Sequence, residues 1–169
     1  TGKYRVLLAD DHKIFRQGMK RLLEEKPEFE VVGGVSDGSE LLERLEQFKP
    51  HMILLDISMP QIGGIDATRE IRKVYSEIKI IILTMHKKKE YMYHAISAGA
   101  QGYLLKEDSD IELFLAIEAI RNGDLYVSRL LVGDMAKDIS SILEQKSNVK
   151  PLTDREKEIA GMVLQGMRD

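Results

Sequence analysis

The sequence contains no cysteine, which excludes disulfide bonds and any metal site built on thiolates. It also lacks a long hydrophobic run, because its longest apolar stretches, such as Met52–Leu55 and Ile80–Leu83, are far too short to span a bilayer. No basic-then-apolar signal peptide opens the chain. Together these absences predict a cytoplasmic protein that has no contact with a membrane.

An excess of positive charge is missing as well. The chain carries 25 basic and 28 acidic side chains, which gives a formal net charge of −3 at pH 7. Nucleic-acid-binding proteins usually show a basic patch. If this protein binds DNA, we expect the residues that do so to be poorly represented within positions 1–169.

The apolar residues that are present recur in a regular alternation. At 169 residues and 43% hydrophobic, the chain can bury a sizeable core. Five short segments are nearly continuously apolar, as strands buried on both faces are. They are Arg5–Ala9, Glu30–Gly33, His51–Leu55, Lys79–Leu83 and Gly102–Leu105. Segments with helical spacing separate them, so we predict the α/β class: a (βα)5 doubly wound, five-stranded parallel sheet with helices on both faces.

The alternation stops after Gly123. Ser128 could cap a helix carrying an apolar stripe, and the polar segment before Pro151 is typical of a linker. Thr153 and Glu156 have the spacing of a capping box at the start of another helix. We therefore expect three units: 3–122, a linker with a helix over 123–150, and a partial helical domain over 151–169.

Four of the five predicted strands are followed by a polar side chain. The residues are Asp10 and Asp11 after the first strand, Asp56 after the third, Thr84 after the fourth and Lys106 after the fifth. In a doubly wound sheet, ligands bind beyond the carboxyl ends of the strands. Three carboxylates, a hydroxyl and an ammonium group are thus expected to meet at one edge.

Such a cluster suggests phosphoryl chemistry. Carboxylates held together repel one another unless a shared cation offsets their charge, and Mg²⁺ is the usual dication where a phosphoryl group completes the coordination shell. Asp56, at the central strand end, is the best candidate for a nucleophile that forms an acyl phosphate. Lys106 and Mg²⁺ would offset the charge on the phosphoryl oxygens, and the Thr84 hydroxyl can donate to one of them.

Each of these residues also has a structural interpretation. A pair such as Asp10 and Asp11 is most often a helix N-cap with a neighbour favoured by the helix dipole. A hydroxyl or an ammonium group at a strand end, such as Thr84 or Lys106, is common. It is their occurrence together at four strand ends that favours the functional interpretation. The four histidines show no metal-ligand spacing, and the run Lys87–Lys89 is typical of a solvated loop.

Residues 3–122 resemble the receiver domain of bacterial two-component response regulators, down to the loop DISMPQIGG at positions 56–64. The resemblance implies the flavodoxin-like strand order 2-1-3-4-5 for the sheet. It also implies that Asp56 is the phosphoacceptor, with Thr84 and Lys106 as its catalytic partners. It implies that Asp10, Asp11 and Asp56 hold Mg²⁺ together with the backbone carbonyl of Ser58, and that Thr84 and Tyr103 form a conformational switch. Many receivers have proline after the lysine, whereas this chain has Glu107, which leaves open whether the family's cis peptide occurs there.

Residues 151–166 resemble the opening of a LuxR-type helix-turn-helix domain, as in the NarL/FixJ-like regulators. This resemblance implies a transcription regulator that is phosphorylated by a sensor histidine kinase and forms a homodimer when phosphorylated. Promoter DNA would be bound only by a longer chain, so no DNA-binding residue is expected here. Beyond its own phosphorylation and slow dephosphorylation, the protein would not act as an enzyme.

Two other functions remain open at this point. A haloacid-dehalogenase-type phosphatase also uses an aspartate nucleophile, Mg²⁺, a threonine and a lysine. However, that family places its nucleophile in an Asp-x-Asp motif after the first strand, and Asp10-Asp11-His12 breaks the pattern. A stand-alone receiver acting through protein contacts is the other possibility, and the capping box at Thr153 argues against it.

Overall fold

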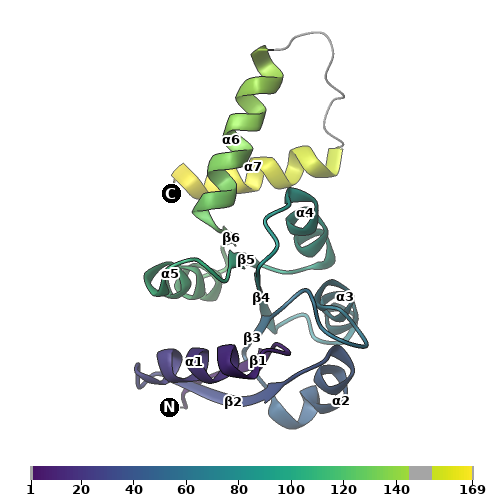
Figure 1. Ribbon diagram of the computed structural model, residues 1–169, viewed down its shortest axis with the longest axis vertical. Coiled ribbons are helices and arrows are strands. Elements are labelled where there is room, and N and C mark those ends of the chain that lie inside the picture. Colours follow the sequence, from purple (N-terminus) through teal and green to yellow (C-terminus); the bar gives the residue numbers. More distant parts are fainter. Residues whose placement is uncertain (1, 145–153, 169) are drawn as a thin grey trace.

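A computed structural model describes residues 2–144 and 154–168 and shows one parallel sheet with helices on both faces (Figure 1). The strands of this sheet are β1 (Tyr4–Ala9), β2 (Phe29–Val35), β3 (Met52–Leu55), β4 (Lys79–Thr84), β5 (Gly102–Leu105) and β6 (Tyr126–Val127). The helices are α1 (Lys13–Glu24), α2 (Gly38–Phe48), α3 (Gly64–Val74), α4 (Lys89–Ala98), α5 (Asp110–Arg121), α6 (Arg129–Glu144) and α7 (Asp154–Arg168).

The strand order is β2-β1-β3-β4-β5-β6. The predicted fold class and the order of the five predicted strands are confirmed. The two-residue strand β6 extends the sheet beside β5, within the segment expected to be a linker. Hydrophobic periodicity could not reveal β6, because a strand of two residues is too short to show an alternating pattern. Its hydrogen bonds to β5 define it instead.

The hydrophobic core lies on the two faces of the sheet. Side chains of a strand alternate between faces, and in β1 Val6 and Leu8 pack on the side of α1 and α5, whereas Leu7 and Ala9 pack on the side of α2, α3 and α4 (Figure 1). β3, β4 and β5 are buried along nearly their whole length. The near-continuous apolar runs in the sequence therefore reflect burial on both faces.

The C-terminal helices continue from the edge of the sheet. Ser128 precedes α6 and its hydroxyl donates to Asp108 Oδ1 at 3.0 Å. Leu131 and Met135 of α6 are buried, and so are Ile159 and Val163 of α7. α7 lies across α4 and β6 (Figure 1). The predicted capping residue Thr153 lies outside the described residues.

Among the residues that the structure describes, no helix has both the length and the apolar character needed to cross a membrane.

Candidate functional site

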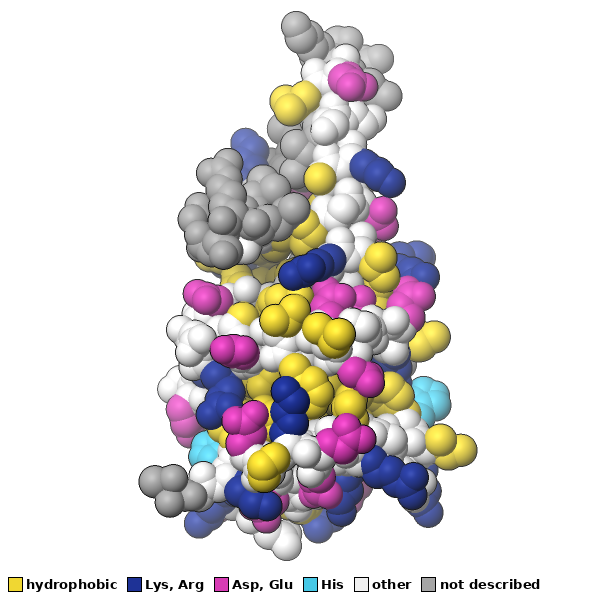
Figure 2. Space-filling model, turned by 90° about the vertical axis from the view of Figure 1, so that its left-hand side faces the viewer, with side chains coloured by type: hydrophobic (Ala, Val, Ile, Leu, Met, Phe, Trp, Pro, Cys, Tyr) yellow, Lys and Arg dark blue, Asp and Glu magenta, His cyan; other side chains and the backbone are white. Residues whose placement is uncertain are grey.

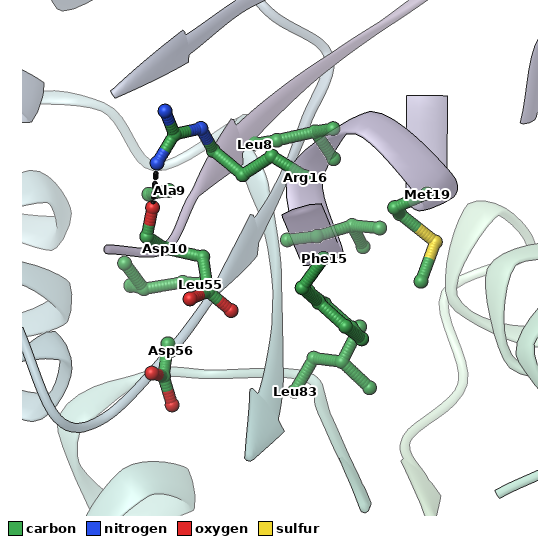
Figure 3. Close-up of a pocket in the computed structure, with 10 residues that line it drawn as sticks. Leu8, Ala9, Asp10, Phe15, Arg16, Met19, Leu55, Asp56 and Leu83 are labelled. Carbon is green, nitrogen blue, oxygen red and sulfur yellow. Dashed lines mark hydrogen bonds between the residues drawn. The ribbon is translucent and has the colours of Figure 1, made fainter. Parts of the chain in front are cut away.

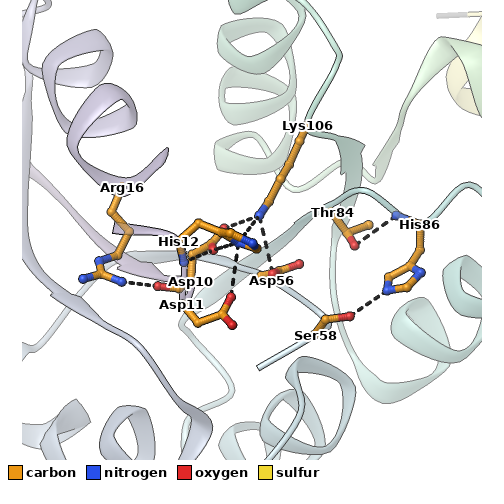
Figure 4. Close-up of polar contacts among 9 residues, drawn as sticks. All are labelled: Asp10, Asp11, His12, Arg16, Asp56, Ser58, Thr84, His86 and Lys106. Atoms are coloured by element: carbon orange, nitrogen blue, oxygen red, sulfur yellow. Dashed lines mark hydrogen bonds and ion pairs between the residues drawn. The ribbon is translucent and has the colours of Figure 1, made fainter. Parts of the chain in front are cut away.

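The polar residues predicted at the strand ends lie at one edge of the sheet (Figure 4). Backbone hydrogen bonds between neighbouring strands place them there: the Asp56 amide donates to the Ala9 carbonyl at 2.9 Å, and the Lys106 amide donates to the Thr84 carbonyl at 2.8 Å. Asp10 directly follows β1, the strand that lies between β2 and β3 in the sheet. The positions of these side chains are therefore fixed by the sheet itself rather than by flexible loops.

Asp10 and Asp56 are buried carboxylates, 4% and 3% exposed, whereas Asp11 is exposed at the rim. One ligand atom from each of Asp10, Asp11, His12 and Asp56 lies within 4.8 Å of the others. Burial raises the pKa of the Asp56 carboxyl above its usual range; Lys106 opposes this shift, and the charge of Asp10 adds to it. The site thus concentrates negative charge where water screens it poorly.

Part of this burial comes from an apolar wall of side chains beside the carboxylates (Figure 3). A cavity next to Asp10 and Asp56 is lined by Leu8, Leu54, Leu55, Phe15, Met19 and Leu83, among others. Gly64, the first residue of α3, comes so close to the backbone carbonyl of Asp56 that a Cβ atom there would overlap it. Asp56 is therefore confined between the sheet, the apolar wall and the start of α3.

Lys106 supplies positive charge inside the cluster. Its Nζ lies 2.6 Å from Asp10 Oδ2 and 3.5 Å from Asp56 Oδ2, and its side chain is only 7% exposed. His12 Nδ1 is 3.3 Å from the same ammonium group. The described peptide bonds are all trans, including the bond between Lys106 and Glu107 that the sequence left open.

Thr84 and Tyr103 both contact the backbone of His86. The His86 amide donates to Thr84 Oγ1 at 3.2 Å, and the Tyr103 hydroxyl donates to the His86 carbonyl at 3.0 Å. Tyr103 is fully buried, and desolvation raises the pKa of its hydroxyl. The two residues predicted to form a switch are thus joined through the loop between β4 and α4.

Several contacts were not predicted from the sequence. The Ser58 hydroxyl and His86 Nε2 are 2.6 Å apart, which joins the loops after β3 and β4 across the site (Figure 4). The guanidinium group of Arg16 donates to the Asp10 carbonyl. His12 belongs to the acidic cluster, and its position directly after the aspartate pair was the one available signal.

The donor set fits a hard dication. Three carboxylates offer oxygen ligands within a small volume. Two of them, Asp10 and Asp56, are buried, and the charge of Asp10 raises the pKa of Asp56. Mg²⁺ and Ca²⁺ prefer oxygen ligands, and Mg²⁺ is typically held by one or two carboxylates together with phosphate oxygens. Asp10, Asp11 and Asp56 thus form an acidic cluster suited to such an ion.

Comparison with known proteins gives a consistent picture. Residues 6–118 match the response regulator receiver domain. The transcriptional regulatory protein DegU of Brevibacillus brevis is 35% identical over 143 residues, which cover 85% of this chain and 61% of that protein. This chain therefore spans less than two thirds of that relative.

Solved structures agree with the sequence comparison. A LuxR-family two-component response regulator from Aurantimonas sp. SI85-9A1 superposes with a TM-score of 0.77 at 35% identity, covering 82% of this chain and 99% of that one. The isolated REC domain of RcsB from Salmonella enterica serovar Typhimurium, in the presence of phosphomimetic BeF3−, gives 0.72 at 26% identity over 77% and 96%. A structure of RcsB dimers bound to two parallel DNAs gives 0.73 at 26% identity over 94% and 75%.

Proposed function

This chain belongs to the response regulator receiver family, and from that membership we propose that it is a two-component switch that accepts a phosphoryl group on Asp56 from a sensor histidine kinase. The observation that carries the proposal is the position of Asp56. This residue is a buried carboxylate at the central strand end, with Lys106 and Asp10 beside it. The chain would catalyse its own phosphorylation and slow dephosphorylation and no other reaction.

In the proposed reaction, a carboxylate oxygen of Asp56 attacks phosphorus while the bond from phosphorus to the donor breaks. The leaving group keeps the electron pair of that bond, and the product is an acyl phosphate. Asp10, Asp11, Asp56 and the backbone carbonyl of Ser58 would hold Mg²⁺. When bound, this ion would offset the charge on the phosphoryl oxygens. Lys106, now 3.5 Å from Asp56, would pair with one of these oxygens.

We further propose that Thr84 and Tyr103 transmit the phosphorylation of Asp56 to the loop between β4 and α4. The Thr84 hydroxyl accepts a hydrogen bond from the His86 amide, and the Tyr103 hydroxyl donates to the carbonyl of the same residue. If Thr84 turns to donate to a phosphoryl oxygen, the His86 backbone loses a partner and the loop before α4 must rearrange. α4 contacts α7, so the movement would reach the helix at the start of the proposed DNA-binding unit.

Control of transcription is proposed on the basis of the relatives, since DegU is a transcriptional regulatory protein and RcsB dimers bind DNA. The surface over α1 and α5 suits a second copy of this chain. Hydrophobic side chains gather there between charged ones (Figure 2), and Ile14 and Ile111 are exposed. Lys13 and Lys20 on α1 and Asp110 and Glu118 on α5 are exposed, so a two-fold arrangement that sets α1 against α5 of the second copy would bring opposite charges together.

Phosphoryl labelling tests the proposal. We expect incubation with Mg²⁺ and acetyl phosphate to add one phosphoryl group per chain, and hydroxylamine to remove it, because acyl phosphates react with this nucleophile. Intact-mass measurement with and without hydroxylamine checks both points. A chain that gains no phosphoryl group, or gains one that resists hydroxylamine, would contradict the proposal.

Metal binding should stabilise the fold, because a cation reduces the repulsion among Asp10, Asp11 and Asp56. The gain follows RT ln(1 + [Mg²⁺]/Kd), about 1.4 kcal/mol at ten times Kd. We expect Mg²⁺ to raise the melting temperature of the wild type, and Asp11→Asn to reduce this rise. Asp66→Asn, at an exposed position on α3, is the control and should leave the rise unchanged. Equal rises in both variants would exclude Asp11 as a ligand.

A further inference from the structure

The ammonium group of Lys106 lies between acidic side chains and an aromatic ring. Its Nζ is 2.6 Å from Asp10 Oδ2 and 4.5 Å from the centroid of the Phe15 ring. Because the lysine side chain is almost completely buried, the carboxylates and the ring occupy much of the space that water would otherwise fill. Lys106 therefore depends on these neighbours for its position and its solvation.

Phe15 is placed for this contact by α1. It lies one helical turn after Asp11. Side chains of a helix point back toward the N-terminus of that helix, and the N-terminus of α1 lies at the edge of the sheet that carries the site. The ring lines the cavity next to Asp10 and Asp56, where it faces Leu83 (Figure 3). It also borders the groove between α1 and α5. Phe15 thus connects the outer surface of the receiver to the strand ends.

We propose that Phe15 is a positioning residue for the phosphorylation of Asp56, which holds the Lys106 ammonium beside the site of phosphoryl transfer through a cation–π contact. The negative face of an aromatic ring attracts a cation, and the attraction is strongest where water is excluded. This inference rests on the proposed assignment of Asp56 as the phosphoacceptor.

The geometry explains why a ring is useful at this position. The ammonium group is now nearer to Asp10 than to Asp56, so it must shift if it is to pair with a phosphoryl oxygen. A carboxylate binds through directed hydrogen bonds that such a shift breaks. A ring face imposes no such direction, so Lys106 can move toward Asp56 while it keeps its contact with Phe15. The ring would also limit the many rotamers that a free lysine side chain samples.

Fluorinated phenylalanines test this inference, because fluorine withdraws electrons from the ring face while the ring keeps nearly the same size. One, two or three fluorine atoms would be introduced at Phe15 by site-specific incorporation, and the initial rate of labelling by acetyl phosphate would be measured at fixed Mg²⁺. Phe114 is the matched control, because its ring contacts another ammonium group, Lys26 Nζ at 4.0 Å, outside the site. Melting temperatures would show that all chains are folded.

We expect the labelling rate to fall progressively with fluorination of Phe15, by about fivefold for three fluorine atoms, and to stay constant with fluorination of Phe114. A role in packing alone would leave the rate unchanged in the fluorinated Phe15 series, and that result would overturn the inference while Asp56 remained the phosphoacceptor. Equal falls in the two series would overturn it as well. If the unmodified chain were not labelled at all, the assignment of Asp56 would fail and this inference with it.

Discussion

Asp56→Asn is expected to abolish labelling by acetyl phosphate while the chain remains folded. The amide has nearly the shape of the carboxylate, but its nitrogen and oxygen are poor nucleophiles toward phosphorus, so no acyl phosphate can form. The replacement also removes one negative charge from a buried acidic cluster, which should not weaken the fold. Intact-mass measurement after incubation with Mg²⁺ and acetyl phosphate gives the extent of labelling, and circular dichroism gives the fold.

Asp66→Asn is the matched control for this loss. Asp66 is an exposed aspartate in the first turn of α3, paired with Arg69, and it takes no part in the strand-end cluster. Its replacement should leave labelling unchanged. Stoichiometric labelling of the Asp56→Asn chain would assign the phosphoryl group to another residue.

Lys106→Met should lower the free energy of unfolding by about 3 kcal/mol in metal-free buffer, because it leaves buried carboxylates without their cationic partner. Methionine keeps much of the apolar stem that packs near Phe15, so the change tests mainly the charge. The change removes two ion pairs, in which Lys106 Nζ lies 2.6 Å from Asp10 Oδ2 and 3.5 Å from Asp56 Oδ2. Urea unfolding in the presence of EDTA measures the loss, and Mg²⁺ should recover part of it.

Lys87→Met provides the comparison for this prediction. Lys87 forms an ion pair of 2.7 Å with Glu107, but both side chains are largely exposed to water. Ion pairs of this kind contribute little to stability, so the free energy of unfolding should hardly change. If Lys106→Met and Lys87→Met unfolded at the same urea concentration, burial of the Lys106 cluster would not have the importance that we assign to it.

Much of the fold could be predicted from the sequence, because strands that are buried on both faces leave a pattern in the chain. Runs such as Ile80–Leu83 are typical of strands buried on both faces, and their regular alternation with helical segments favours a parallel sheet. The close approach of Asp10, Asp56 and Lys106 follows from the same pattern, since parallel strands end at one edge. These three residues are far apart in the sequence, so nothing except the strand pattern indicates that they lie close together.

The remaining contacts depend on loops and on helix orientation, which periodicity does not encode. The Ser58 hydroxyl reaches His86 only because the loops after β3 and β4 bend toward each other. The contact between Phe15 and Lys106 depends on the rotation of α1 about its axis. Similarly, the sequence predicts that a helix begins near Asp154, but it does not predict that Ile159 packs near α4.

Chemical mapping of the phosphorylated residue tests the central claim most directly. Borohydride reduces an aspartyl phosphate to homoserine, so peptide mass spectrometry after phosphorylation and reduction identifies the residue that carried the phosphoryl group. We predict homoserine at position 56 in the peptide that contains Ile57 and Ser58, with Asp10 and Asp11 unmodified. Homoserine at position 10 or 11, or a stable phosphoryl group on a serine, threonine or histidine, would contradict the account.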